Sequence, residues 1–229
     1  MAEVMTAREA VSRITSGSTI MVGGFGRVGS PETLLEALAC HDADALTIIC
    51  NDLGSHNEGI GVVLLQNKIK KAIGSFFTPN PDAAKYYREG KIEIELIPQG
   101  NFAEAIRAAG AGLGGFLTPV GVGTELARGH ELITVNGKEY ILQEPIKADY
   151  AFVRAKKADK HGNLVYSKAA RNFNPIMATA AKICIAEVDA IVEAGELSPE
   201  QIVTPFLYVD ILVVREARSC SRMNSVRLE

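Results

Sequence analysis

The chain of 229 residues has no tryptophan, only four cysteines and four histidines, and a net charge of −3. No basic run with interleaved aromatic residues is present, which argues against a nucleic-acid-binding protein. No apolar stretch is long enough to span a bilayer, and the N-terminus lacks the apolar core of a signal peptide. These absences predict a cytoplasmic protein that binds neither nucleic acid nor membrane.

The four cysteines contain no C-x-x-C pair, and no histidine stands at metal-ligand spacing from any of them. The sequence therefore predicts no metal site. Cys40, Cys50 and Cys184 fall in apolar strand or helix patterns, where we expect buried free thiols, whereas Cys220 lies in a polar tail. Free thiols are typical of a reducing compartment, in agreement with a cytoplasmic location.

Length and composition indicate one globular domain. Hydrophobic residues make up 47% of the chain and charged residues 22%, which is ordinary for a soluble protein with one sizeable core. Apolar periodicity ends near residue 218. We therefore expect a single domain over residues 1–218 and a polar, disordered tail over residues 219–229.

Strand-like runs alternate with helical patterns, which predicts an α/β fold with an open, mostly parallel sheet covered by helices. The exception is an alternating pattern on both sides of Asn136-Gly137, the strongest short signal for a hairpin, which predicts a small antiparallel flap over residues 131–142. Strands are expected at residues 19–22, 45–50, 71–77, 92–97, 150–155, 183–186 and 211–214, and helices after Ser30 and at residues 58–66, 80–88, 102–109 and 175–181.

A glycine-dense loop joins the first strand to the first helix. Ser30 is placed to cap that helix, and Pro31 suits its first turn. Glycine lacks a Cβ, so a ligand can approach the backbone closely, and N–H groups near a helix start attract anions. This pattern predicts contact with a phosphate-bearing ligand. The loop consists of Gly23, Gly24, Phe25, Gly26, Arg27, Val28 and Gly29.

Residues 24–29 also match the pattern G-x-G-x-x-G, which taken alone is weak evidence for a dinucleotide site. In that fingerprint the third glycine lies inside the helix, whereas Ser30-Pro31 places the helix start after Gly29. Asp52 comes late for the acid that would bind a ribose. A P-loop is excluded because no Gly-Lys-Ser/Thr follows. A tight turn without a ligand stays an alternative.

Two amide side chains follow predicted strands at the sheet edge where open α/β sheets bind ligands. Asn51 comes after the second strand and Gln99 after the fourth. An amide at Gln99 could donate to a carbonyl or carboxylate oxygen without adding charge. Loop capping by Asn51 and a plain turn at Gln99 explain the same residues. No Ser-His-Asp or Cys-His order stands out, so the chain has a binding loop without an evident nucleophile.

Residues 17–31 resemble the signature of family I CoA-transferases, specifically of their A (alpha) subunit, of the acetate, acetoacetate or succinyl-CoA:3-oxoacid type. The resemblance covers nearly the whole chain. Ser16 and Phe206 depart from it, since the family usually has Asp or Asn at the first position and glycine at the second. Further motifs recur in the family's order: Asn51-Asp52, Pro98-Gln99-Gly100, residues 112–119, Arg171-Asn172-Phe173-Asn174-Pro175 and residues 202–205.

The resemblance implies that the nucleophile is a glutamate of a partner, the B (beta) subunit, which forms a glutamyl-CoA thioester. This chain would then hold no nucleophile of its own and would be active only with the beta subunit, as a heterodimer or heterotetramer. Residues 23–29 would contact CoA. Asn51 and Gln99 would face the acyl and carboxylate groups, with Gln99 polarising the thioester carbonyl. Substrates would be an acyl-CoA and a short-chain carboxylic acid, without metal or permanently bound cofactor.

Sugar-phosphate isomerases and effector-sensing domains of transcription regulators share the open α/β fold, and they are the alternative interpretation. An isomerase should carry its own acid and base, and a regulator should carry a DNA-binding segment, for which residues 1–14 are too short. An NAD-dependent oxidoreductase is disfavoured by the position of Ser30-Pro31. Acyl specificity stays open, because the pocket would be shared with the beta subunit.

Overall fold

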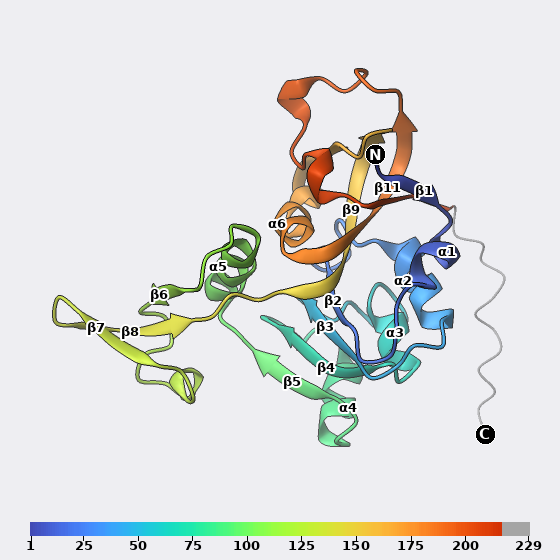
Figure 1. Ribbon diagram of the computed structural model, residues 1–229. Coiled ribbons are helices and arrows are strands. Elements are labelled where there is room, and N and C mark those ends of the chain that lie inside the picture. Colours follow the sequence, from blue (N-terminus) through green and yellow to red (C-terminus); the bar gives the residue numbers. More distant parts are fainter. Residues whose placement is uncertain (217–229) are drawn as a thin grey trace, which may run out of the picture.

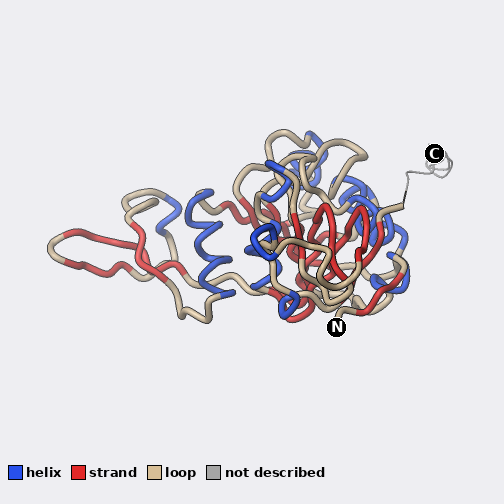
Figure 2. The backbone as a smooth tube through the Cα atoms, turned by 90° about the horizontal axis from the view of Figure 1, so that it is seen from above, coloured by secondary structure: helices blue, strands red, loops and turns tan. Residues whose placement is uncertain are grey.

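The computed structural model describes residues 1–216, so the tail predicted for residues 219–229, with Cys220, lies outside the described part. An open sheet has helices on both faces, and a small antiparallel sheet projects from one side (Figures 1 and 2). The expected fold class is therefore confirmed. Among residues 1–216, no helix has the length and apolar character needed to cross a membrane.

The main sheet has nine strands, and all neighbours along its path pair in parallel, in the order β1-β12-β11-β9-β2-β3-β4-β5. Only β10 is antiparallel, and it pairs with β9. The carboxyl ends of the parallel strands therefore share one edge. The strands are β1 (Glu3–Met5), β2 (Thr19–Val22), β3 (Leu46–Cys50), β4 (Ile69–Gly74), β5 (Glu93–Leu96), β9 (Ala148–Asp159), β10 (Leu164–Val165), β11 (Ala181–Val192) and β12 (Ile211–Val214).

Two hydrophobic cores lie on opposite faces of this sheet. Ile48 and Cys50 of β3 pack into one core, and Ile49 between them packs into the other, as the two-residue period of a strand requires. One core is covered by α1 (Ala7–Val11), α2 (Glu32–Cys40), α3 (Gly61–Leu65) and α4 (Pro81–Arg88), and the other by α5 (Gln99–Gly110) and α6 (Asn174–Thr179) (Figure 1).

The flap is a three-stranded antiparallel sheet of order β6-β8-β7, built from β6 (Phe116–Thr118), β7 (Leu132–Val135) and β8 (Lys138–Gln143). The predicted hairpin is confirmed. Asn136 and Gly137 have φ angles of 51° and 75°, as a two-residue hairpin turn of positive φ requires. The third strand, β6, was not predicted, because three residues after a glycine-rich run carry no clear alternation.

β9 and β11 differ most from their predicted lengths, since each has 12 residues. They pair with each other along this whole length, well past the end of β2. Charged residues directly after the predicted strands, Lys156 and Lys157 in β9 and Glu187 in β11, interrupt the apolar pattern, so periodicity alone ended these strands early. β1 and α1 at the N-terminus were also not predicted.

Cys50 and Cys184 are buried free thiols, as expected, but the prediction for Cys40 is wrong, because its side chain is exposed. Cys40 is the last residue of α2, whose buried face consists of Leu34, Leu35 and Leu38. Burial raises the pKa of the Cys50 thiol, and the nearby Asp52 charge raises it further, so this thiol stays protonated.

The prediction that Ser30 caps α2 is also wrong. The helix begins at Glu32, and no side chain at the capping position bonds to it. Instead, Glu187 of β11 accepts hydrogen bonds from the N–H groups of Thr33 (2.8 Å) and Leu34 (3.2 Å). A carboxylate at a helix N-terminus accepts hydrogen bonds from N–H groups that have no partner within the helix. Its negative charge also interacts favourably with the positive end of the helix dipole. No local pattern could indicate this cap, because it comes from a distant strand.

Glu187 is fully buried, with 0% of its surface exposed. Its second oxygen, Oε1, has no hydrogen-bond partner among the described residues, although Arg154 Nε lies 3.5 Å away and Arg215 Nε 3.9 Å away. Burial raises the pKa of Glu187 to about 7, against the opposing effects of the Leu34 N–H and the two arginines.

This raised pKa predicts a pH-dependent stability. The folded state holds the Glu187 proton more tightly than the unfolded state, so the free energy of unfolding should fall as pH rises from about 4.5 to about 7. The loss attributable to this one group is roughly 3 kcal/mol at most. Urea unfolding at pH 5, 6, 7 and 8 measures it. Glu187→Gln should flatten the slope, whereas Glu193→Gln, at an exposed site just beyond β11, should not. Equal slopes in all three proteins would contradict this assignment.

Candidate functional site

The carboxyl ends of β2, β3, β4 and β5 bring together the segments that the sequence singled out. The glycine loop (residues 23–29) follows β2, Asn51 and Asp52 follow β3, and Ser75 follows β4. Gln99 comes just after β5. It is the first residue of α5, so this helix begins three residues earlier than its pattern predicted.

A continuous chain of hydrogen bonds links these strand ends. Gln99 Nε2 donates to Asn51 Oδ1 at 3.0 Å, and Ser75 Oγ donates to the same oxygen at 2.9 Å. Asn51 Nδ2 in turn donates to Asp52 Oδ2 at 2.9 Å. The Gly26 N–H reaches that same carboxylate oxygen at 2.7 Å. The structure therefore connects Gln99, Asn51 and the glycine loop through Asp52, which the sequence did not single out for this role.

Protein acceptors take up the N–H groups of five residues of the glycine loop: Gly23, Gly24, Phe25, Gly26 and Val28. Gly23 donates to Phe152, and Phe25 and Val28 bond each other, so that the loop closes as a tight turn. With Gly26 bound to Asp52, a carboxylate stands where an anionic ligand was expected. That the N–H groups of this loop face a phosphate stays a prediction, although in this structure acceptors within the protein already take up those of Gly23, Phe25, Gly26 and Val28. Both carboxylate oxygens of Asp52 already accept hydrogen bonds within the protein, so this residue does not match the acid that binds a ribose.

The loop instead exposes side chains at its tip. Phe25 and Val28 are 49% and 51% exposed, so both present apolar surface to the solvent. Arg27 forms ion pairs with Glu58 (3.0 Å) and Glu32 (3.8 Å), which connect the loop to the neighbouring turn and to α2. Contact between residues 23–29 and CoA stays a prediction, and these side chains are the means by which it could occur.

Asn172 and Asn174, from the Arg171–Pro175 motif, hold the loop from the other side. Asn172 accepts from the Gly24 N–H at 3.1 Å and donates to the Val28 carbonyl at 2.8 Å, so it joins both arms of the loop. Asn174 donates to the Gly29 carbonyl at 3.1 Å. In the sequence, this motif carried part of the family resemblance but no assigned role. Its spacing of nearly 150 residues from the loop gave no local signal of contact.

Close approach explains the glycine at position 23. A Cβ there would lie 1.9 Å from Asn174 Oδ1, and Asn174 is fully buried. The same Asn174 oxygen accepts from the Arg154 N–H at 2.8 Å, so it has little freedom to move. Glycine is thus required at position 23 for packing inside the protein rather than for space for a ligand.

The chain alone does not enclose a substrate at this edge. The hollow between the glycine loop and Asn51-Asp52 is about 10 Å³, room for about one water molecule. A site for a molecule as large as an acyl-CoA therefore needs further walls.

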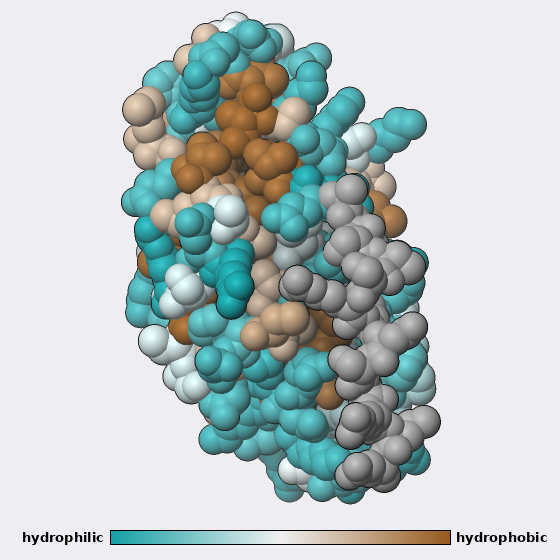
Figure 3. All heavy atoms as spheres, turned by 90° about the vertical axis from the view of Figure 1, so that its right-hand side faces the viewer, coloured by the Kyte–Doolittle hydropathy of each residue, from teal (hydrophilic) through white to brown (hydrophobic). Residues whose placement is uncertain are grey.

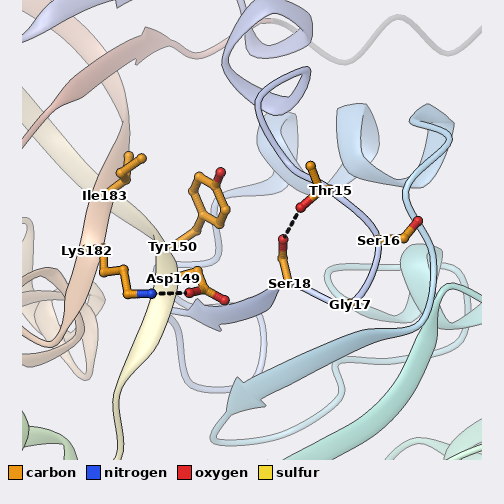
Figure 4. A pocket seen from close by; sticks show the side chains of 8 residues that line it. All are labelled: Thr15, Ser16, Gly17, Ser18, Asp149, Tyr150, Lys182 and Ile183. Carbon is orange, nitrogen blue, oxygen red and sulfur yellow. Dashed lines mark hydrogen bonds and ion pairs between the residues drawn. The ribbon is translucent and has the colours of Figure 1, made fainter.

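A larger hollow, of about 360 Å³, lies at the opposite edge, by the amino ends of β2, β9 and β11 (Figure 4). Its charged groups are paired, since Lys182 contacts Asp149 at 2.8 Å and the Thr19 N–H reaches the same carboxylate. The Lys182 hydrogen bond, with that of Thr19, holds the pKa of Asp149 below its ordinary value. Ser16 lines this hollow, and its hydroxyl accepts from the Asp44 N–H at 3.0 Å. Serine at position 16, where the family usually has Asp or Asn, therefore still accepts a hydrogen bond that holds this turn.

Reactive groups are sparse in the described part of the chain. Among residues 1–216, no cluster of three histidine, cysteine, aspartate or glutamate side chains could hold a metal ion. The exposed His56 pairs with the partly buried Asp82 at 2.7 Å. Phe206, the second family departure, is exposed and packs near His161, with its N–H bonded to Asn163.

The chain belongs to the coenzyme A transferase family, whose model matches residues 4–215. The A subunit of the 3-oxoadipate CoA-transferase of Pseudomonas putida is 48% identical over 214 residues, which cover 93% of each chain. The alpha subunit of the acetate CoA-transferase of Escherichia coli is 43% identical over 93% of this chain and 97% of its own. These findings confirm the resemblance and support neither the isomerase nor the effector-sensing alternative.

Solved structures agree with this assignment. The acyl-CoA transferase YdiF of Escherichia coli, in a thioester complex with CoA, is 25% identical and superposes with a TM-score of 0.81. The match covers 93% of this chain but 47% of YdiF, so the chain spans about half the length of that enzyme. Glutaconate CoA-transferase of Acidaminococcus fermentans, 19% identical with a TM-score of 0.82, shares the fold.

The contact between Gly23 and Asn174 can be tested by stability. Gly23→Ala should lower the free energy of unfolding by about 2 kcal/mol or more, since the new Cβ displaces a buried, hydrogen-bonded side chain. Gly114→Ala is the control, because a Cβ at this exposed glycine meets nothing within 4 Å. Its effect should stay within roughly 0.5 kcal/mol. Urea unfolding of both variants measures the difference. Equal losses in the free energy of unfolding would refute the proposed packing requirement.

Proposed function

We propose that this chain is the A (alpha) subunit of a CoA-transferase that moves CoA between a short-chain acyl-CoA or 3-oxoacyl-CoA and a carboxylic acid such as acetate. The observation that carries the proposal is its 43–48% identity, over 93% of its length, to two subunits of such enzymes. The partner is the beta subunit, in a heterodimer that doubles to a heterotetramer, and the location is the cytoplasm. The carboxylate and the thioester carry the chemistry, so neither metal nor bound cofactor takes part.

In this mechanism the nucleophile is a glutamate of the beta subunit, which attacks the thioester carbonyl of the acyl-CoA. The CoA thiolate leaves, and an acyl-glutamyl anhydride forms. The thiolate then attacks the glutamyl carbonyl, which releases the acyl group as a carboxylate and leaves a glutamyl-CoA thioester. The acceptor acid reverses these steps. Dividing one hard transfer into easier ones is the usual gain of covalent catalysis.

Gln99 suits the role of oxyanion donor. Its Nε2 carries two hydrogens, and the bond to Asn51 uses one of them. The second N–H is available for the oxygen of the thioester carbonyl, which gains negative charge in the tetrahedral transition state. The position of Gln99 at the first turn of α5 adds the positive end of a helix dipole.

Exposed apolar surface is consistent with a partner subunit. Phe25 and Val28 lie at the candidate site, and Leu117, Leu132 and Val135 are exposed on the flap. On the face that carries β1 and α1, hydrophobic residues gather in the upper half (Figure 3). Apolar surfaces of this kind mark interaction sites on soluble proteins. In the proposed complex, the beta subunit supplies the missing walls and therefore shares the choice of acyl group.

The test is reconstitution with the beta subunit of the same host. Transfer of CoA from acetoacetyl-CoA to acetate should require both chains. Gln99→Ala should lower kcat about 100-fold or more through loss of an oxyanion donor. Complex formation, followed by size-exclusion chromatography, should be unchanged. Gln66→Ala, at an exposed position after α3, should behave as the wild type. Activity of this chain alone, or full turnover by Gln99→Ala, would overturn the corresponding assignment.

A further inference from the structure

We propose that Asp52 is a positioning residue, which fixes the orientation of the Gln99 amide through Asn51. The inference rests on the proposed function, because it assigns Gln99 the role of oxyanion donor. It is carried by the hydrogen bonds at the strand ends, in which Asp52 is the one side chain that as a carboxylate can only accept.

An ionised carboxylate only accepts hydrogen bonds, whereas an amide side chain both donates and accepts. Asp52 receives three N–H groups: Gly26 at 2.7 Å, Asn51 Nδ2 at 2.9 Å and Gly54 at 3.1 Å. Asn51 must therefore turn its NH₂ group toward Asp52. In the flipped orientation its oxygen would face the carboxylate, which is electrostatically unfavourable.

The orientation of the Asn51 amide in turn sets that of Gln99. With Nδ2 committed to Asp52, Asn51 presents Oδ1 to the other side, where Ser75 Oγ and Gln99 Nε2 both donate to it. Asn51 is only 1% exposed, so water does not compensate for a flipped amide. Gln99 therefore points its NH₂ group, and not its oxygen, toward Asn51, which fixes the direction of its second N–H.

Asp52 also joins the glycine loop to this arrangement. Its Oδ2 holds the Gly26 N–H at the loop tip, where φ is 57°, while Asn172 holds both arms. One carboxylate is thus the common anchor of the loop and of the Gln99 amide. A preorganised donor is worth more in catalysis than one that must reorient during the reaction.

Asp52→Asn in the complex of both subunits is the direct test. The new NH₂ group must face the N–H of either Gly26 or Gly54. Where it faces Gly26 it also faces Asn51 Nδ2, which favours the flipped Asn51 amide. We expect kcat to fall about tenfold, with KM for both substrates nearly unchanged, because an oxyanion donor acts mainly in the transition state. Asp82→Asn is the matched control. It makes the same carboxyl-to-amide change at a partly buried site on α4, outside this chain of bonds, and should keep wild-type kinetics.

A double-mutant cycle separates positioning from a general structural role. If Asp52 acts through Gln99, Asp52→Asn should lower kcat in the wild type but not in a Gln99→Ala background. Equal losses in both backgrounds, or an unchanged kcat in the single variant, would overturn the inference. If Asp52→Asn does not fold, Asn51→Ala replaces it, since it interrupts the same chain of bonds without a change of charge, with the same expected result.

A readout without catalysis distinguishes this inference from the proposed function. The side-chain NH₂ resonances of Gln99, identified in ¹⁵N–¹H spectra by their absence in Gln99→Ala, should shift in Asp52→Asn and not in Asp82→Asn. Unshifted resonances in Asp52→Asn would reject the role of Asp52. If the wild-type complex is inactive but the Gln99 resonances shift in Asp52→Asn, the proposed function is rejected and the positioning by Asp52 stands.

Discussion

Parallel pairing of β2, β3, β4 and β5 is the constraint on which the candidate site depends. In a parallel sheet every strand runs in one direction, so all carboxyl ends meet at a single edge. The glycine loop, Asn51 and Gln99 lie up to 76 positions apart (residues 23–99), yet this geometry makes them neighbours. Helices on both faces bury the strands and leave that edge as the place where polar side chains can gather.

A second principle shapes the site: buried N–H and carbonyl groups must find partners. Here the partners come from distant segments. Glu187 takes the first N–H groups of α2, Asn172 joins the arms of the glycine loop, and Asp52 takes the loop tip. The loop is therefore held by protein contacts on both arms and at its tip, and its glycines serve internal packing at position 23 and positive φ angles at Gly24, Gly26 and Gly29.

The site has the character of one half of an enzyme. An amide donor and a glycine loop with exposed apolar side chains stand at an edge that encloses about 10 Å³. Membership of the coenzyme A transferase family gives these features a common explanation. A second subunit would cover the loop, complete the pocket and bring the nucleophile, while this chain provides preorganised hydrogen-bond donors.

The sequence by itself determined the features that depend on near neighbours. The alternation of strands and helices, the hairpin at Asn136-Gly137 and the place of Asn51 and Gln99 after strands all follow from local periodicity and turn chemistry. Tertiary structure decided which residues satisfy one another. Glu187 rather than Ser30 caps α2, and Asp52 accepts the N–H at the tip of the glycine loop. β9 and β11 reach 12 residues each because they pair with each other. Such partners are set by the topology of the sheet, which places residues up to about 150 positions apart in contact, beyond the range of any local pattern.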